Sequence, residues 1–241
     1  MSYTSWRGVV GLIKPTHRPG SLEEFIRLLP EGIGVIPLFV GFQRGNEDEF
    51  REALRAYEER VDELAGLGVD VIHPEGAPPF MVHGYKGEQE IVQAWEKKHK
   101  IPIVTASMTQ VESLRALKAK KVLGVTYFTG KINDTFTRYF IEAGFEILAM
   151  EGIPVAFEDV GKLSGEEVYA HTRKAFLRYP GAEAIYMLGS GWRTLNIIQP
   201  LEQDLEIPVV HAVPARVWAI QKRLHVRQPV RGYGRLLEEM P

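Results

Sequence analysis

The chain alternates short apolar segments with longer amphipathic segments along most of its length. The apolar segments are rich in Val and Ile and continuous, which is typical of parallel strands buried on both faces. Because the segments between them favour helices, the pattern predicts βαβ units with right-handed crossovers and an α/β fold. The expected strands are 8–14, 34–39, 69–73, 101–105, 122–126, 146–150, 184–188 and 209–211, and the expected helices are 47–67, 88–99, 110–119, 133–143 and 165–178.

The two halves of the chain resemble each other. The segment VVGLIKPT from Val9 matches VLGVTYFT from Val122, and GVDVIHPEG from Gly68 matches GAEAIYMLG from Gly181, both at an offset of 113 residues. A third pair, IPIVTA and IPVVHA, has an offset of 106 residues. Generic likeness between buried strands does not explain matched glycines outside the strands, so we interpret the pattern as an internal duplication.

A duplication predicts two pseudo-symmetric, flavodoxin-like lobes, each a parallel sheet flanked by helices, with a cleft between them. We expect residues 1–112 and 214–241 to form the first lobe and residues 113–213 to form the second. Ligands of open parallel sheets bind beyond the carboxyl ends of the strands. We therefore expect the turns at 14–16, 73–78, 126–129 and 189–194 to surround one cleft, with Gly76 and Gly189 in equivalent places.

Composition excludes several classes of function. The net charge of −2 gives no electrostatic reason to expect a nucleic-acid or membrane partner. No apolar stretch approaches the ~20 residues of a membrane span, and the N-terminus does not read as a secretory signal, so we expect a cytoplasmic protein. The chain has no cysteine, which excludes disulfides, thiolate metal sites and cysteine nucleophiles.

The strand-end turns and the ending GYGRLLEE resemble the aspartate/glutamate racemase superfamily, especially its arylmalonate decarboxylase and maleate cis-trans isomerase branch. The similarity extends from Gly11 to the tail and is most specific in LGSGWRTLNIIQPLEQDLEIPVV and VPARVWA. The resemblance implies that a small carboxylate binds in the cleft, held by backbone amides and hydroxyls without a metal or an organic cofactor. In that family, one or two cysteines transfer a proton at the α-carbon or attack a double bond.

This sequence departs from the family pattern at both cysteine positions, which Gly76 and Gly189 occupy. Glycine at the first position also occurs in the decarboxylase branch, whereas Gly189 removes the remaining thiol. Ala77 and a proline replace the hydroxyl residues that follow the first position. Phe128, preceded by Tyr127, stands where the family has an anion-binding tyrosine. The resemblance therefore supports the fold and the pocket more strongly than the chemistry.

A proton-transfer enzyme without a thiol needs another titratable group near the substrate carbon. Glu75 is the first candidate, because apolar neighbours would raise its pKa; it could also be a solvated turn residue or pair with Lys14. Lys14 could neutralise a substrate carboxylate or extend into solvent. His211 could donate a proton or only hydrogen-bond a neighbouring loop. No short-spaced ligand motif supports a metal site built from His73, Glu75 and His211, so no metal is expected.

The turn at 189–191 precedes a helix that we expect to begin near Thr194, and its N–H groups could bind an anion. Arg193 could clamp a carboxylate or form an interlobe salt bridge. Ser190 could act as a nucleophile only with a nearby base such as His211. The residues expected to bind the substrate are Gly76, Ala77, Thr126, Tyr127, Phe128, Gly189, Ser190 and Arg193.

Two loops could close over the cleft. One contains His17 and Arg18, and the other contains Tyr85 between Gly84 and Gly87, whose freedom would suit a mobile lid. Ordinary surface turns have the same composition.

The leading hypothesis is a cofactor-independent lyase or isomerase, decarboxylase-like or maleate-isomerase-like. It would act beside the carboxylate of a small (di)carboxylic acid with a non-cysteine acid or base. The alternatives are a protein that binds or senses a small carboxylate and has lost catalysis, and a hydrolase of altered mechanism. We expect no cofactor and a small carboxylate as the partner. A homo-oligomer is plausible, but the sequence does not fix its size.

Overall fold

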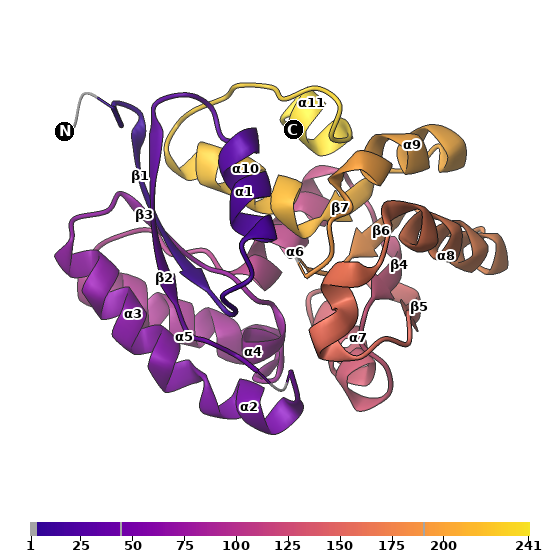
Figure 1. Cartoon of the computed structure of the whole chain (residues 1–241), viewed down its shortest axis with the longest axis horizontal. Coiled ribbons are helices and arrows are strands. Elements are labelled where there is room, and N and C mark those ends of the chain that lie inside the picture. Colours follow the sequence, from indigo (N-terminus) through magenta and orange to yellow (C-terminus); the bar gives the residue numbers. More distant parts are fainter. Residues whose placement is uncertain (1–3, 44, 190) are drawn as a thin grey trace.

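The structure is a computed structural model that describes residues 4–43, 45–189 and 191–241. Its described strands form two parallel sheets flanked by helices (Figure 1), which confirms the α/β prediction. The first sheet has the order β2-β1-β3 and the second the order β5-β4-β6-β7, so each lobe places its first strand between its second and third. The strands are β1 Gly8–Lys14, β2 Ile33–Phe39, β3 Val71–Pro74, β4 Lys121–Thr126, β5 Glu146–Gly152, β6 Ala184–Met187 and β7 Val209–His211.

The expected strand at 101–105 is wrong. This segment pairs with β3 at a single position, where Ile103 lies parallel to Ile72, and it does not form a strand of the sheet. The chain leaves the sheet because the Thr105 side chain accepts a hydrogen bond from the Met108 N–H and begins the next helix. A local helix cap therefore ends the extended segment early.

The helices follow the expected amphipathic segments, with two differences. The segment 47–67 is divided at Ala53, and the proposed lid around Tyr85 is wrong because helix α5 begins at Gly84. The Tyr85 N–H donates to Glu142 Oε2 at 2.8 Å, which fixes this helix start. The helices are α1 Gly20–Leu28, α2 Glu47–Glu52, α3 Leu54–Gly66, α4 Pro78–Met81, α5 Gly84–His99, α6 Ala106–Ala116, α7 Lys131–Glu142, the 3₁₀ helix η1 Phe157–Lys162, α8 Gly165–Arg178, α9 Leu195–Leu205, α10 Ala212–Arg223 and α11 Arg235–Glu239.

Helix α10 lies between the two sheets and connects the lobes (Figure 1). It packs against β3 of one sheet and β7 of the other, and against α1 and α6. Its residues from Ala212 to Gln221 are all buried, including Trp218 and Arg216. One apolar core joins side chains of both lobes through this helix, so the two halves share a core. The lobe boundaries at 112/113 and 213/214 stay a prediction.

Among the helices of the described residues, none has the length and apolar character required to cross a membrane.

Gly152, the last residue of β5, supports the turn after β4. A Cβ at Gly152 would lie 1.9 Å from the Phe128 carbonyl oxygen. That oxygen also accepts a hydrogen bond from Asn133 Nδ2 at 2.8 Å, so the turn has little room to yield. Gly152→Ala should therefore lower the free energy of unfolding by about 2 kcal/mol or more in urea denaturation.

Gly181→Ala is the matched control, because a Cβ there would meet no atom within 4 Å. It should change the free energy of unfolding by no more than about 0.5 kcal/mol. Equal effects of the two substitutions would contradict the assignment of Gly152 as a close-contact glycine.

Candidate functional site

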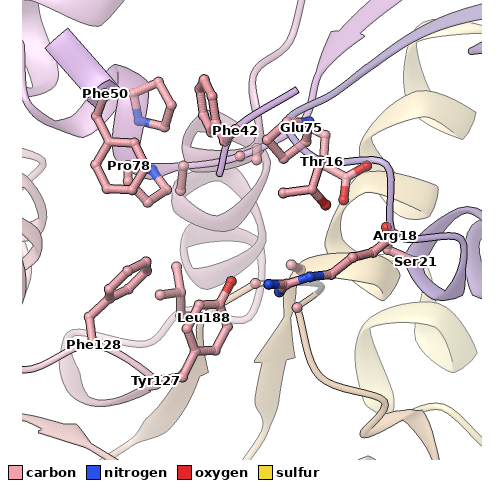
Figure 2. A pocket seen from close by; sticks show the side chains of 18 of the residues that line it. Thr16, Arg18, Ser21, Phe42, Phe50, Glu75, Pro78, Tyr127, Phe128 and Leu188 are labelled. Carbon is pink, nitrogen blue, oxygen red and sulfur yellow. The ribbon is translucent and has the colours of Figure 1, made fainter. Parts of the chain in front are cut away.

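A pocket lies between the lobes at the carboxyl ends of the strands (Figure 2). Its walls come from the turns after β1, β3, β4 and β6, and α6 and α10 contribute Ala106, Gln110, Ala212 and Arg216. The four strand-end turns that the repeat pattern singled out therefore meet around one cavity. This is the interlobe cleft expected from the sequence.

Two glycine turns, one from each half of the chain, line the pocket. Gly76 follows β3 with φ +96°, and Gly189 follows β6 with φ +76°, values that disfavour any residue with a side chain. A Cβ on Gly76 would lie 3.0 Å from the Tyr57 hydroxyl, and a Cβ on Gly189 would lie 2.5 Å from the Tyr127 hydroxyl. Tyrosine hydroxyls thus occupy the space beside both glycines, and the two turns present backbone to the pocket.

A buried ionic cluster adjoins the first glycine turn. Glu75 Oε2 lies 2.8 Å from Arg216 Nη1 and 3.5 Å from Lys14 Nζ, and all three side chains are almost fully buried. The Lys14 ammonium donates to the Ser21 hydroxyl, and Arg216 Nη2 donates to the Ser21 carbonyl oxygen at 2.6 Å. With every group ionised, the cluster carries one positive charge in excess, which favours an anion in the adjacent pocket.

Burial acts against the charge of Lys14. Removal from water lowers the pKa of the Lys14 ammonium, the Glu75 carboxylate raises it, and the Arg216 guanidinium lowers it further. The lowering by burial is the largest of these effects. Lys14 therefore gives up its proton more readily than an exposed lysine does.

The opposite side of the pocket is apolar. Phe128 packs edge-to-face on Phe50 and stacks on Phe157, with ring centroids 6.1 Å apart in both pairs. Figure 2 shows Phe50, Pro78 and Phe128 on one side and Glu75 on the other, with Phe42 between them. The pocket thus offers an aromatic wall to an apolar substituent and a charged wall to an anion.

Arg18 also lines the pocket, and its side chain extends toward Tyr127 (Figure 2). Its Nη2 donates to the Phe157 carbonyl oxygen at 2.6 Å, and its guanidinium lies 4.7 Å from the centroid of the Phe157 ring. Because Arg18 follows β1 and Phe157 begins η1, this contact joins segments from the two halves of the chain.

Of the three predicted catalytic residues, Glu75 lines the pocket, Lys14 lies directly behind it, and His211 does not line it. His211 Nδ1 accepts the Val213 N–H at 3.1 Å, so its Nε2 carries the proton toward the Thr194 hydroxyl at 3.0 Å. Burial lowers the pKa of His211 to about 3. His211 caps α10 just as Thr105, its repeat partner, caps α6.

The predicted binding residues separate into three groups. Thr126 lies beneath the wall, where its hydroxyl accepts the Phe128 N–H at 3.1 Å and shapes the turn. Arg193 is exposed outside the pocket and pairs with Glu23 of the other lobe at 2.6 Å, the salt bridge given as its alternative. Ser190 lies outside the described residues. The predicted residues that line the pocket are Gly76, Ala77, Tyr127, Phe128 and Gly189.

Tyr127 keeps its proton at the edge of the pocket. Burial raises the pKa of Tyr127 to about 12, so its hydroxyl is neutral at physiological pH. Its ring packs edge-to-face on Trp192 at 5.1 Å. Tyr127 therefore offers a neutral hydroxyl beside Gly189 and does not act as a base.

Sequence reasoning missed Arg216 and Gln110. Arg216 is the one charged residue within the apolar run VPARVWAI, a signal that could have marked it as a buried ion with a partner. Gln110 begins the expected helix at 110–119, and nothing in the sequence assigned its side chain to the pocket. Among the described residues, no group of three or more His, Asp and Glu side chains is arranged to hold a metal ion.

Comparisons with known proteins agree with this geometry. A family model described as "Arylmalonate decarboxylase" matches residues 10–237. Arylmalonate decarboxylase of Bordetella bronchiseptica is 22% identical over 95% of this chain and 96% of its own length. Maleate isomerase of Nocardia farcinica is 32% identical over 54% of this chain and 51% of its own length.

Solved structures give the same result for the fold. The maleate isomerase Iso of Pseudomonas putida S16 has a TM-score of 0.87 at 21% identity and covers 97% of this chain and 99% of its own. A liganded arylmalonate decarboxylase, in which a glycine and a cysteine were exchanged for cysteine and serine, has a TM-score of 0.89 at 21% identity, with coverage of 96% and 99%. A maleate isomerase variant from Nocardia farcinica, described as carrying a covalently bound succinylcysteine intermediate, has a TM-score of 0.89 at 23% identity, with coverage of 96% and 98%.

The ionic cluster makes a prediction about stability. Glu75→Leu leaves Lys14 and Arg216 buried beside each other without their carboxylate, which should lower the free energy of unfolding by about 3 kcal/mol. Adding Lys14→Met should recover at least about 1 kcal/mol, because it removes one of the two cations. Urea denaturation of the single and double variants measures both changes.

The exposed pair of Arg193 and Glu23 is the control, since both side chains are more than half exposed. Glu23→Gln should change the free energy of unfolding by less than about 1 kcal/mol. A double variant less stable than Glu75→Leu would contradict the account of the buried cluster.

Proposed function

We propose that this chain, which belongs to the arylmalonate decarboxylase family, is a cofactor-independent lyase that decarboxylates a small malonate-type acid with an apolar substituent. The observation that carries the proposal is the position of Glu75. It lines the pocket opposite the aromatic wall and adjoins Lys14, a buried lysine whose pKa is lowered. A proton carrier other than sulfur is thereby available beside a site that favours anions.

Decarboxylation suits this site better than isomerisation of a double bond. The maleate isomerase variant with a succinylcysteine has formed a bond between substrate carbon and a thiol. This chain has no cysteine, and both glycine turns exclude a side chain. Loss of CO₂ requires no nucleophile, because the carbon–carbon bond breaks with its electron pair left on the α-carbon. The reaction needs only anion stabilisation and one proton.

The anion would be held at the glycine turns. Backbone N–H groups near Gly76 and Gly189 can donate to the retained carboxylate, and Arg18 in the pocket lining supplies a positive charge. When CO₂ leaves, this carboxylate becomes an enediolate with more charge on its oxygens. Fixed donors bind that state more tightly than the substrate, which lowers the barrier. The aromatic wall of Phe50 and Phe128 takes the apolar substituent.

The proton would come from the Lys14 ammonium by way of Glu75. The Glu75 carboxylate accepts a proton from Lys14 Nζ, 3.5 Å away, and then donates it to the α-carbon of the enediolate. Lys14 regains its proton from solvent after the product leaves. Arg216 stays charged throughout and holds the Glu75 carboxylate in place at 2.8 Å. His211 has no part in this sequence, because both of its ring nitrogens serve the fold.

A second candidate is a protein that binds a small carboxylate without turning it over. It is favoured by the loss of both thiols and by Ala77 and Pro78 at the positions of family hydroxyl residues. A hydrolase of altered mechanism is the third alternative. The cytoplasmic location and the oligomeric state remain predictions from the sequence.

The test uses 2-methyl-2-phenylmalonate, which has no exchangeable α-hydrogen. In D₂O the protein should release CO₂ and form 2-phenylpropanoate with one deuterium on the α-carbon, seen by NMR. Glu75→Gln keeps the shape of the side chain but removes its acid function, so the rate should fall about 100-fold or more. Glu23→Gln, on the exposed surface, should keep the rate within about twofold of the unmodified protein.

Two results would overturn the proposal. Tight binding of the malonate with no CO₂ release would favour the binding protein. Full activity in Glu75→Gln would assign the proton to another group. Maleate should not be converted to fumarate, because no thiol is present to add to its double bond.

A further inference from the structure

Two residues that line the pocket carry polar atoms without a hydrogen-bond partner in the described part of the chain. His73 and Gln110 line the pocket and are both completely buried. Neither the amide nitrogen nor the amide oxygen of Gln110 has a hydrogen-bond partner among the described residues, and the same is true of His73 Nε2. Buried polar atoms without partners are costly and uncommon. Their position in the cavity wall points to a ligand.

The hydrogen bonding of His73 defines what its free nitrogen can do. His73 Nδ1 lies 2.7 Å from the Val104 carbonyl oxygen, which can only accept, so Nδ1 carries the ring proton. Burial, together with the nearby Arg216 guanidinium, lowers the pKa of His73 to about 3, so the ring is neutral near pH 7. His73 Nε2 is therefore an acceptor that requires a donor.

Gln110 differs from the other polar side chains of its helix. Thr109 and Ser113 each donate to a carbonyl oxygen of α6, at 2.7 Å in both cases, and are satisfied locally. Gln221, another buried glutamine, accepts the Gln228 N–H at 2.8 Å through its amide oxygen. Gln110 has neither kind of contact within the described residues, so both functions of its amide are available to a ligand.

The charges nearby select the kind of ligand group. An ammonium group would be repelled by Arg216 and Lys14, both of which lie beside Glu75. A carboxylate would meet the lone pair of His73 Nε2, which has no proton to donate to it. A neutral group that both donates and accepts avoids each of these conflicts. It can donate to His73 Nε2 and accept from the Gln110 amide nitrogen.

We propose that the part of the pocket lined by His73 and Gln110 is a subsite for a neutral hydroxyl-type group on the substrate. The substrate class is then an acid that carries an apolar substituent and a hydroxyl-bearing branch on the same α-carbon. This inference rests on the proposed function in one respect, that the ligand of the pocket is a small carboxylic acid. Decarboxylation itself is not required for it.

The test compares two unreactive acids that differ by one oxygen atom, 2-phenylpropanoate and 3-hydroxy-2-phenylpropanoate. Calorimetry should show that the hydroxylated acid binds about tenfold more tightly, as one well-placed hydrogen-bonding group provides. Gln110→Met, of similar volume, should remove this preference and change the affinity for 2-phenylpropanoate less than about twofold. His73→Met is the second variant and should have the same effect.

Gln221→Met is the matched control, since it removes a buried amide outside the pocket and should retain the tenfold preference. Equal binding of the two acids by the unmodified protein would overturn the subsite and assign these atoms to a resident water. A preference that survives in both Gln110→Met and His73→Met would also overturn it. A preference without CO₂ release from the malonate would refute the proposed decarboxylation alone and leave the subsite standing.

Discussion

The carboxylate of Glu75, held between two buried cations, connects the parts of this site. Lys14 ends β1, Glu75 follows β3, and Arg216 comes from the central helix α10, so one ionic cluster joins three segments distant in sequence. Such clusters are weak sources of stability, because each ion loses its hydration on burial. Apolar residues of similar size in the same places often make the folded protein equally stable. A cluster of this kind at a pocket wall is thus better explained by chemistry than by folding.

The cluster also explains how the site can work without sulfur. The two glycine turns present backbone to the pocket, and a Cβ on either glycine would lie against a tyrosine hydroxyl. Proton transfer must then come from a side chain beside the turns. Glu75 is next to Gly76 in the chain, and in the proposed mechanism it receives its proton from Lys14, whose Nζ lies 3.5 Å away. In the proposed function, the glycine turns bind the anion as the family's turns do. The acid is Glu75, one residue before the first family cysteine position at Gly76.

Much of the fold could be predicted because its signals are local. The continuous apolar runs became β1, β4 and β7 with little change, and 165–178 is a helix because Ser164 and Glu167 form a capping box. The strand predicted at 101–105 was wrong because a side-chain cap ends the extended segment early. The lid predicted around Tyr85 was wrong because Gly84 begins a helix. The matched strand order of the two sheets agrees with a duplication, which stays a prediction.

The site was only partly predictable, because its chemistry depends on contacts between distant segments. Gly76 and Gly189 could be found from the repeat, but the partner of Glu75 in α10 could not, since nothing local places Arg216 beside β3. The same reason separates Arg193 from the site. Its sequence neighbourhood left an anion clamp and an interlobe salt bridge equally open, and the fold gives the salt bridge, to Glu23.

A crystal structure with phenylacetate in the pocket tests the central claim most directly. The account predicts that the carboxylate accepts hydrogen bonds from backbone N–H groups at the two glycine turns, with a Glu75 oxygen within about 3.5 Å of the α-carbon. A carboxylate bound elsewhere, or a Glu75 side chain that faces away from that carbon, would contradict it.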